Sequence, residues 1–192
     1  MPTSLVVRLV FWLWFAAAVF AGQRLVLERL PPTATTGILL GLAALILAVY
    51  VRVAPIRAWF NALDLRVLVF LHVSRFVGIY FLILYRRGEL PYDFAVPGGL
   101  GDIVVAIFAV PLVFAPIATP RRHRWIYIWN IVGFVEIMMV VVSAIRLNLA
   151  NPAQLRALTH LPLSLLPTFL VPLIIATHLI IFVRLSRERA AA

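Results

Sequence analysis

The stretch GGLGDIVVAIFAVPLVFAPI, residues 98–117, decides the fold, because it is a long apolar run with a single charged residue, Asp102. The hydrocarbon core of a membrane is about 30 Å thick, and a helix needs about 20 apolar residues to cross it. Backbone groups in lipid must be satisfied within their own segment, and a continuously apolar run is typical of a helix of this length. The stretch therefore predicts a transmembrane helix with an aspartate near its start.

The whole chain shares the composition of this stretch. Of its 192 residues, 64% are hydrophobic and 12% are charged, whereas soluble domains have about 45–50% and about 25%. The mean hydropathy is +1.06. We predict an all-α membrane protein, a six-transmembrane-helix bundle in one domain over residues 1–192, with spans at about 5–22, 37–54, 66–85, 98–117, 126–147 and 161–184.

Arginine alone supplies the basic residues, since all 17 of them are Arg and none is Lys. When alternate loops are grouped, ten arginines fall on one side, six on the other, and Arg75 lies inside the third span. The positive-inside rule then predicts that the N and C termini are both cytoplasmic. We expect a multi-pass protein of the plasma (inner) membrane. The net charge of +10 favours anionic lipid headgroups as partners. Nucleic acid is not expected, because the arginines are scattered over both faces.

Ionisable side chains inside the spans are the main functional signal. Each costs about 2.5–3.5 kcal/mol at the bilayer centre and so usually marks an ion pair or a site. A helical rise of about 1.5 Å per residue places His72 level with His178, and Arg75 level with Glu136. We expect one polar cluster that opens to the cytoplasm, consisting of His72, Arg75, Asn130, Glu136 and His178, with Arg75 and Glu136 as its ion pair.

The same residues also have a purely structural interpretation. An Arg75–Glu136 bridge would fix the order of the helices, and Asn130 would form an interhelical hydrogen bond. We interpret Asp102 as a helix-start anion, because the first turn of a helix offers free amides and the positive end of its dipole. Asp102 would then receive Arg86 or Arg87 from the facing loop.

Three prolines, Pro162, Pro167 and Pro172, make the sixth span unusual. Each removes a backbone donor and tends to kink the helix. The carbonyls freed at Leu163 and Thr168 need other partners. Broken helices of this kind line the binding cavities of transporters, although a bent and inert helix is an equal alternative.

Four stretches resemble a family of small, uncharacterised, bacterial six-span membrane proteins over about residues 65–185: HVSRFVGIYFLIL, FAVPGGLGDIVV, WNIVGFVEI and LPTFLVPLIIATHL. The resemblance implies six spans. It implies no activity, cofactor or site residue.

Several functional hypotheses remain open at this stage. The first is a small carrier or binding protein for a polar or anionic ligand, with or without proton coupling and with no cofactor. The second is a haem b or quinone redox protein in which His72 and His178 ligate one iron. No other metal site is expected, and the absence of cysteine excludes a thiolate site in particular. A membrane enzyme acting on a lipid or isoprenoid, and a structural or accessory subunit within a homo-oligomer or larger membrane complex, complete the alternatives.

Overall fold

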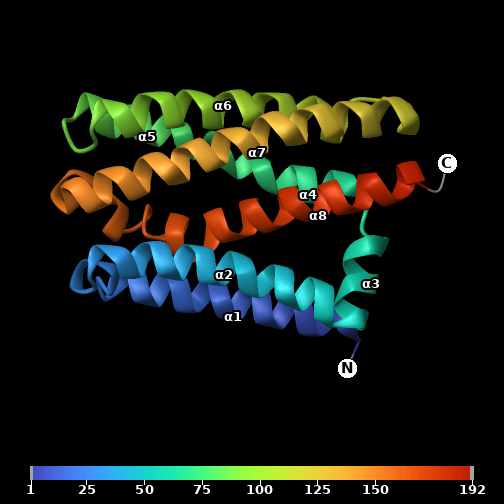
Figure 1. Ribbon diagram of the computed structural model, residues 1–192, viewed down its shortest axis with the longest axis horizontal. Helices are drawn as coiled ribbons and strands as arrows, with labels where there is room; N and C mark the ends of the chain where they lie inside the picture. The colour runs from blue at the N-terminus through green and yellow to red at the C-terminus, as the bar shows by residue number, and fades with distance from the viewer. Residues whose placement is uncertain (1, 191–192) are drawn as a thin grey trace. The chain divides into compact units, whose positions relative to one another are not determined.

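The computed structural model describes residues 2–190, and these residues are helical with no strand among them (Figure 1). Six helical segments in this range are long and apolar enough to cross a membrane: Thr3–Gln23, Pro32–Arg52, Leu65–Arg86, Tyr92–Phe114, Thr119–Ala150 and Leu166–Glu188. The predicted all-α class and the six candidate spans are therefore confirmed. The cytoplasmic position of the termini stays a prediction.

The chain divides into two compact units. The first unit consists of Met1–Leu63 and Leu147–Ala176, and the second consists of Asp64–Arg146 and Thr177–Ala192. Helices α7 (Thr119–Ala150) and α8 (Val171–Ala190) each contribute to both. The single domain expected over residues 1–192 stays a prediction, and residues 1, 191 and 192 of that range lie outside the described residues.

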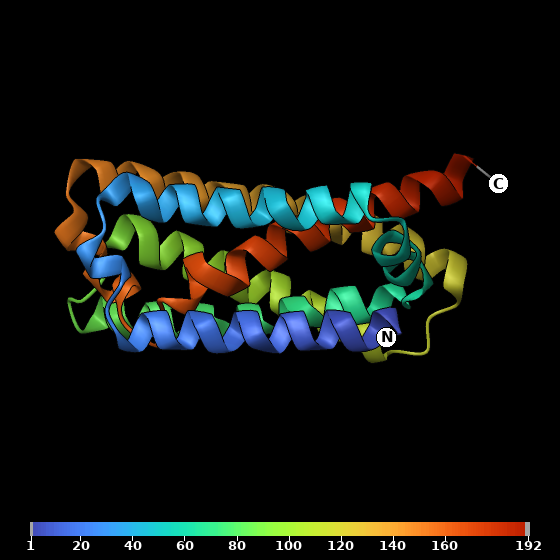
Figure 2. The same cartoon turned by 90° about the horizontal axis from the view of Figure 1, so that it is seen from below.

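The first unit contains α1 (Thr3–Gln23), α2 (Pro32–Arg52) and α3 (Ala54–Ala62). Helices α1 and α2 run in opposite directions (Figure 2). Shorter segments complete it, namely the 3₁₀ helices η1 (Leu27–Arg29) and η3 (Pro152–Thr159) and the π-helix η4 (Leu166–Leu170). Segment η4 packs against both α1 and α2.

Aromatic side chains form the centre of the first unit. The ring of Phe169 lies 5.2 Å from Phe11, 4.8 Å from Trp14 and 5.2 Å from Phe15, measured between centroids. Trp14 Nε1 also donates to the Thr168 carbonyl at 2.9 Å. Pro172 has no N–H to bond that carbonyl, so the indole supplies the partner that the sequence requires.

The second unit is organised around the third and fourth spans. The third span is built from α4 (Leu65–Leu71), the 3₁₀ helix η2 (His72–Val77) and α5 (Gly78–Arg86). Helix α6 (Tyr92–Phe114) packs along all three segments. Asp64 caps α4, because its Oδ1 accepts from the Arg66 amide at 2.9 Å.

The second, fourth, fifth and sixth spans start at other residues than predicted: at Pro32, Tyr92, Thr119 and Leu166. The fourth and the sixth have a visible cause. Helix α6 starts at Tyr92 rather than at residue 98, directly after the extended Pro91. Pro97 lies inside the helix, and Ser143 Oγ donates to the Asp93 carbonyl that this proline leaves free, at 3.1 Å. The sixth candidate span starts at Leu166 rather than at residue 161, because the chain before it forms η3 and then turns.

Candidate functional site

The predicted polar residues meet in the second unit. Residues of η2, α6, α7 and α8 contribute the side chains that we name the buried cluster: His72, Arg75, Asp102, Asn130, Glu136 and His178. In a 3₁₀ helix the side chains at positions i and i+3 eclipse one another, so η2 places His72 and Arg75 on one face. Both of these side chains are fully buried.

Arg75 joins three helices through its guanidinium. Its Nε donates to Asp102 Oδ1 on α6 at 2.6 Å, and its Nη1 donates to the Gly133 carbonyl on α7 at 3.1 Å. Its Nη2 forms an ion pair with Glu136 Oε2, also on α7. The ion pair expected between Arg75 and Glu136 is therefore present, and Asp102 is a second carboxylate on the same cation.

Asp102 does not lie where the sequence places it. Helix α6 begins at Tyr92, so Asp102 is ten residues into the helix, in its third turn. The helix-start interpretation is wrong for this reason, because the free amides and the dipole end lie far from the carboxylate. Its partner is Arg75 rather than Arg86 or Arg87.

Glycines let the helices approach closely enough for these contacts. The backbones of Gly78 on α5 and Gly99 on α6 touch, and a Cβ on Gly99 would lie 2.8 Å from the Gly78 carbonyl oxygen. A Cβ on Gly101 would lie 2.5 Å from Glu136 Oε1, and one on Gly133 would lie 2.8 Å from His178 Cε1. A side chain at Gly78, Gly101 or Gly133 would displace Asp102, Glu136 or His178, and one at Gly99 would separate α6 from α5.

The two histidines also meet. The ring centroids of His72 and His178 are 4.2 Å apart, and the rings are tilted by 55°. Asn130 holds His178 at two points, since its Nδ2 donates to the His178 carbonyl at 3.0 Å and its Oδ1 lies 2.7 Å from His178 Nδ1. His72 Nε2 lies 3.1 Å from the hydroxyl of Thr177. The prediction that His72 and His178 lie at the same depth is therefore confirmed, because the two rings are in contact.

The other nitrogen of each ring has no hydrogen-bond partner among the described residues, although both side chains are fully buried. These atoms are His72 Nδ1 and His178 Nε2. A buried polar atom without a partner costs about 1–3 kcal/mol, so a protein normally avoids it. Here two such atoms lie on touching rings.

The comparisons with known proteins add a family to this geometry. The model of a family described as "Domain of unknown function (DUF8737)" matches residues 31–186. The chain belongs to the DUF8737 family. Among curated proteins and solved structures, none matches the chain. The matched range contains every residue of the buried cluster, and the description of the DUF8737 family carries no activity.

Two residues of this DUF8737 chain that contact the buried cluster, Trp129 and Thr177, could not be assigned to it from the sequence. Trp129 packs against both histidines, with ring centroids 5.0 Å from His72 and 5.6 Å from His178. Its Nε1 donates to the Val105 carbonyl at 2.9 Å, which ties α7 to α6. Thr177 bonds His72. Tryptophan and threonine cost little inside an apolar helix, so neither residue is conspicuous there, and only the fold shows their roles.

The histidine pair does not fit axial ligation of a haem in this arrangement. Metal–nitrogen bonds of about 2 Å on opposite sides of one iron separate the two nitrogens by about 4 Å, and the ring centroids lie farther apart still. The centroids of His72 and His178 are only 4.2 Å apart.

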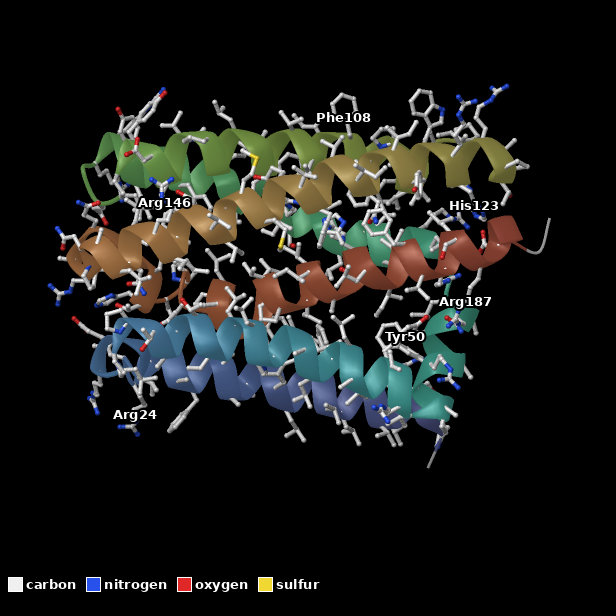
Figure 3. All side chains as sticks on the ribbon, in the orientation of Figure 1. Arg24, Tyr50, Phe108, His123, Arg146 and Arg187 are labelled. Atoms are coloured by element: carbon white, nitrogen blue, oxygen red, sulfur yellow. The ribbon has the colours of Figure 1, made fainter. Side chains whose placement is uncertain are left out.

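An apolar groove of about 440 Å³ lies between α6 and α7. Phe108, one of its lining residues, points away from the neighbouring helices (Figure 3). The groove is lined by Val104, Val105, Phe108, Pro111, Leu112, Ile117, Trp125, Ile128, Trp129 and Val132. This lining includes neither the carboxylates nor the histidines of the buried cluster, so the groove offers an acid–base reaction no catalytic group.

Proposed function

We propose that this DUF8737 protein is a small multi-pass carrier of a bacterial plasma membrane, and that its buried cluster binds and releases one proton. One observation supports the proposal most directly. Two carboxylates, Asp102 and Glu136, pair with a single guanidinium, that of Arg75. With both carboxylates ionised, this group of three carries a formal charge of −1.

A net charge of this kind is expensive where water is excluded, and a buried group usually neutralises instead of remaining charged. Arginine does not lose its proton in proteins, so the adjustable partner is a carboxylate. A single proton on Asp102 or Glu136 brings the group to zero charge. The cluster therefore favours one bound proton when it is closed to water, and releases that proton when water reaches it.

Glu136 is the carboxylate that exchanges the proton in this proposal. Both carboxylates pair with Arg75, and the oxygens of Glu136, which are buried, accept no further hydrogen bond from the described residues. Asp102 accepts a short, charge-assisted bond of 2.6 Å from Arg75. Asp102 serves as the permanent counter-ion of the arginine, and Glu136 serves as the proton carrier.

The anionic ligand that the sequence predicts for Arg75 has little support from this geometry. Two carboxylates already offset the charge of the guanidinium, so an added anion would gain little attraction. The proton is therefore the first species that we assign to the cluster. The cytoplasmic position of both termini, and anionic headgroups as partners of the exposed arginines, belong to the same proposal.

The test is proton uptake by liposomes that contain the purified protein. A pH-sensitive dye is sealed inside, potassium with valinomycin clamps the membrane potential, and the external medium is acidified. The wild type should take up protons faster than protein-free liposomes. Glu136→Gln should lower that rate about 100-fold, the lower end of the effect of a positioned proton-transfer group. Glu136→Gln keeps the Arg75–Asp102 pair, so we expect it to fold.

Glu89→Gln is the matched control, because it removes the same charge at an exposed position outside the cluster. Its uptake rate should equal that of the wild type. A wild type that takes up no more protons than empty liposomes would overturn the carrier proposal. Equal rates for the wild type and Glu136→Gln would overturn the role of the cluster.

A further inference from the structure

We infer that His178 is a second position for the same proton, which it accepts at Nε2, and that Asn130 fixes the imidazole tautomer that makes this possible. The inference rests on the proposed function. His178 would act as a relay for a proton that Glu136 releases. No part of the family description assigns a role to either residue.

The first step concerns the tautomer. Asn130 Nδ2 donates to the His178 carbonyl at 3.0 Å, and a carbonyl can only accept, so this contact fixes which end of the amide is nitrogen. The other end, Oδ1, then accepts from His178 Nδ1 at 2.7 Å. In the neutral imidazole the proton is therefore on Nδ1. The lone pair must be on Nε2.

The second step concerns the direction of that lone pair. The Cε1–Nε2 edge of the ring lies against Gly133, where an added Cβ would be 2.8 Å from Cε1 and 3.2 Å from Nε2. The carbonyl of the same glycine accepts from Arg75 Nη1. His178 Nε2 is buried and has no hydrogen-bond partner among the residues that the structure describes. The proton-accepting atom thus lies beside Gly133, the residue whose carbonyl binds Arg75.

The third step concerns charge. The titratable and charged groups on the elements packed against His178 are His72, whose ring touches it, and Arg75, which bonds the carbonyl of the adjacent Gly133. The carboxylates of Asp102 and Glu136 pair with Arg75. Without an extra proton, Arg75 and its two carboxylates carry −1. An imidazolium at His178 balances this charge as fully as a protonated Glu136 does. The cluster therefore has two neutral states, which differ only in the residue that carries the proton.

The proton transfer breaks one bond at Glu136 and forms one bond at His178. The O–H bond of the Glu136 carboxyl breaks, and an N–H bond forms at His178 Nε2, so the number of protons and the total charge are unchanged. Gly133, which lies against the His178 ring, is one helical turn before Glu136 on α7. We place one water molecule between the carboxyl group and Nε2 as the bridge for the proton, with Arg75 as a further hydrogen-bond donor to it.

The test combines nitrogen NMR with the liposome assay. The protein carries ¹⁵N-histidine and is placed in lipid nanodiscs, and the signal that disappears in His178→Gln belongs to His178. At high pH we expect Nδ1 to be protonated and Nε2 to be bare. Asn130→Leu should convert this single tautomer into a mixture. On acidification, a proton should appear on Nε2 over the pH range in which the protein takes up protons.

In liposomes, His178→Gln should lower proton uptake about 100-fold, as expected for loss of a positioned proton-transfer group. His123→Gln is the control, because His123 pairs with Glu188 outside the cluster and should leave the rate unchanged. Uptake that depends on Glu136 and not on His178 would overturn the relay and leave the proposed function intact. An Nε2–H tautomer would also overturn it. Absence of uptake by the wild type would instead remove the proposed function.

Discussion

The 3₁₀ helix η2 of the second unit and the π-helix η4 of the first unit are both irregular stretches within candidate spans. Segment η2 carries two buried ionisable side chains, His72 and Arg75, and each contacts polar partners. Segment η4 carries no ionisable residue, and its Phe169 packs among aromatic rings. Irregular backbone in a span therefore does not by itself indicate a functional site. The polar groups that the backbone positions make the difference.

The largest expected effect comes from removing the centre of the buried cluster. Arg75→Gln leaves two carboxylates without their cation, and breaking a buried ion pair in this way costs about 3–5 kcal/mol. We expect the free energy of unfolding in detergent to fall by this amount. Arg87→Gln, at an exposed position, should change it by less than about 0.5 kcal/mol. Equal stability of the two variants would contradict the role of Arg75 as the organising cation.

The matching change in the first unit is Phe169→Ala. It removes a buried ring that contacts three other rings, and such truncations cost about 3–5 kcal/mol. We expect the lower end, because packing alone stabilises helix contacts in a membrane. Proton uptake per folded molecule should remain at the wild-type rate. If uptake disappears while the variant stays folded, the distinction between the two irregular segments is wrong.

Two glycine-to-alanine substitutions, one in each unit, compare the two units further, and their expected effects on stability are of intermediate size. Gly133→Ala places a methyl group 2.8 Å from His178 Cε1 and 3.1 Å from Val105 Cγ1, and overpacking of this kind costs about 1–3 kcal/mol. Gly41→Ala on α2 meets no atom within 4 Å. Alanine is favoured over glycine in helices by about 1 kcal/mol, so this second variant should be neutral or more stable. Thermal unfolding should show opposite shifts.

The smallest effect belongs to Asp64, which lies just before α4. Its carboxylate accepts hydrogen bonds from Arg66, and this holds its pKa below the usual value. The folded-state pKa is lower than the unfolded one, so the pair stabilises the protein above the unfolded pKa of about 3.9. That stabilisation is lost as the pH falls through the folded pKa.

Asp64→Asn tests this pair, because asparagine can still cap α4 but carries no charge. The side chain of Asp64 is 47% exposed, so we expect a loss of less than about 1 kcal/mol at neutral pH. The difference should vanish in strong acid. A loss that persists there would mean that the cap, rather than the ion pair, stabilises this helix end.

The sequence predicts the spans and most of the cluster for one physical reason. A helix rises by a fixed distance per residue, so the position of a residue in a span gives its depth in the membrane. The sequence therefore shows that Arg75 and Glu136 lie at one depth, and that His72 and His178 lie at another. Asp102 is misplaced because Pro97 looks like a helix breaker. The carbonyl that this proline frees has a donor in Ser143, fifty residues away, and only the fold reveals that hydrogen bond.

Other parts of the site depend on contacts between helices, which the pattern of residue types along the sequence does not reveal. Thr177 and Trp129 are ordinary residues of apolar helices until their neighbours are known. The tautomer of His178 follows from two distances to Asn130, and no spacing rule gives either of them. Levels in the membrane are therefore predictable, whereas partners, and the charge balance that results from them, require coordinates.

The most direct measurement of the central idea is infrared difference spectroscopy of the purified protein in lipid during a pH titration. Carbonyl absorption of a protonated carboxyl group, identified by its shift in D₂O, reports whether the buried cluster holds a proton. We predict one such band that disappears as the pH rises, that is absent in Glu136→Gln and that is unchanged in Glu89→Gln. A titration without any protonated carboxyl band, or with a band that Glu136→Gln leaves intact, would contradict a proton held at Glu136.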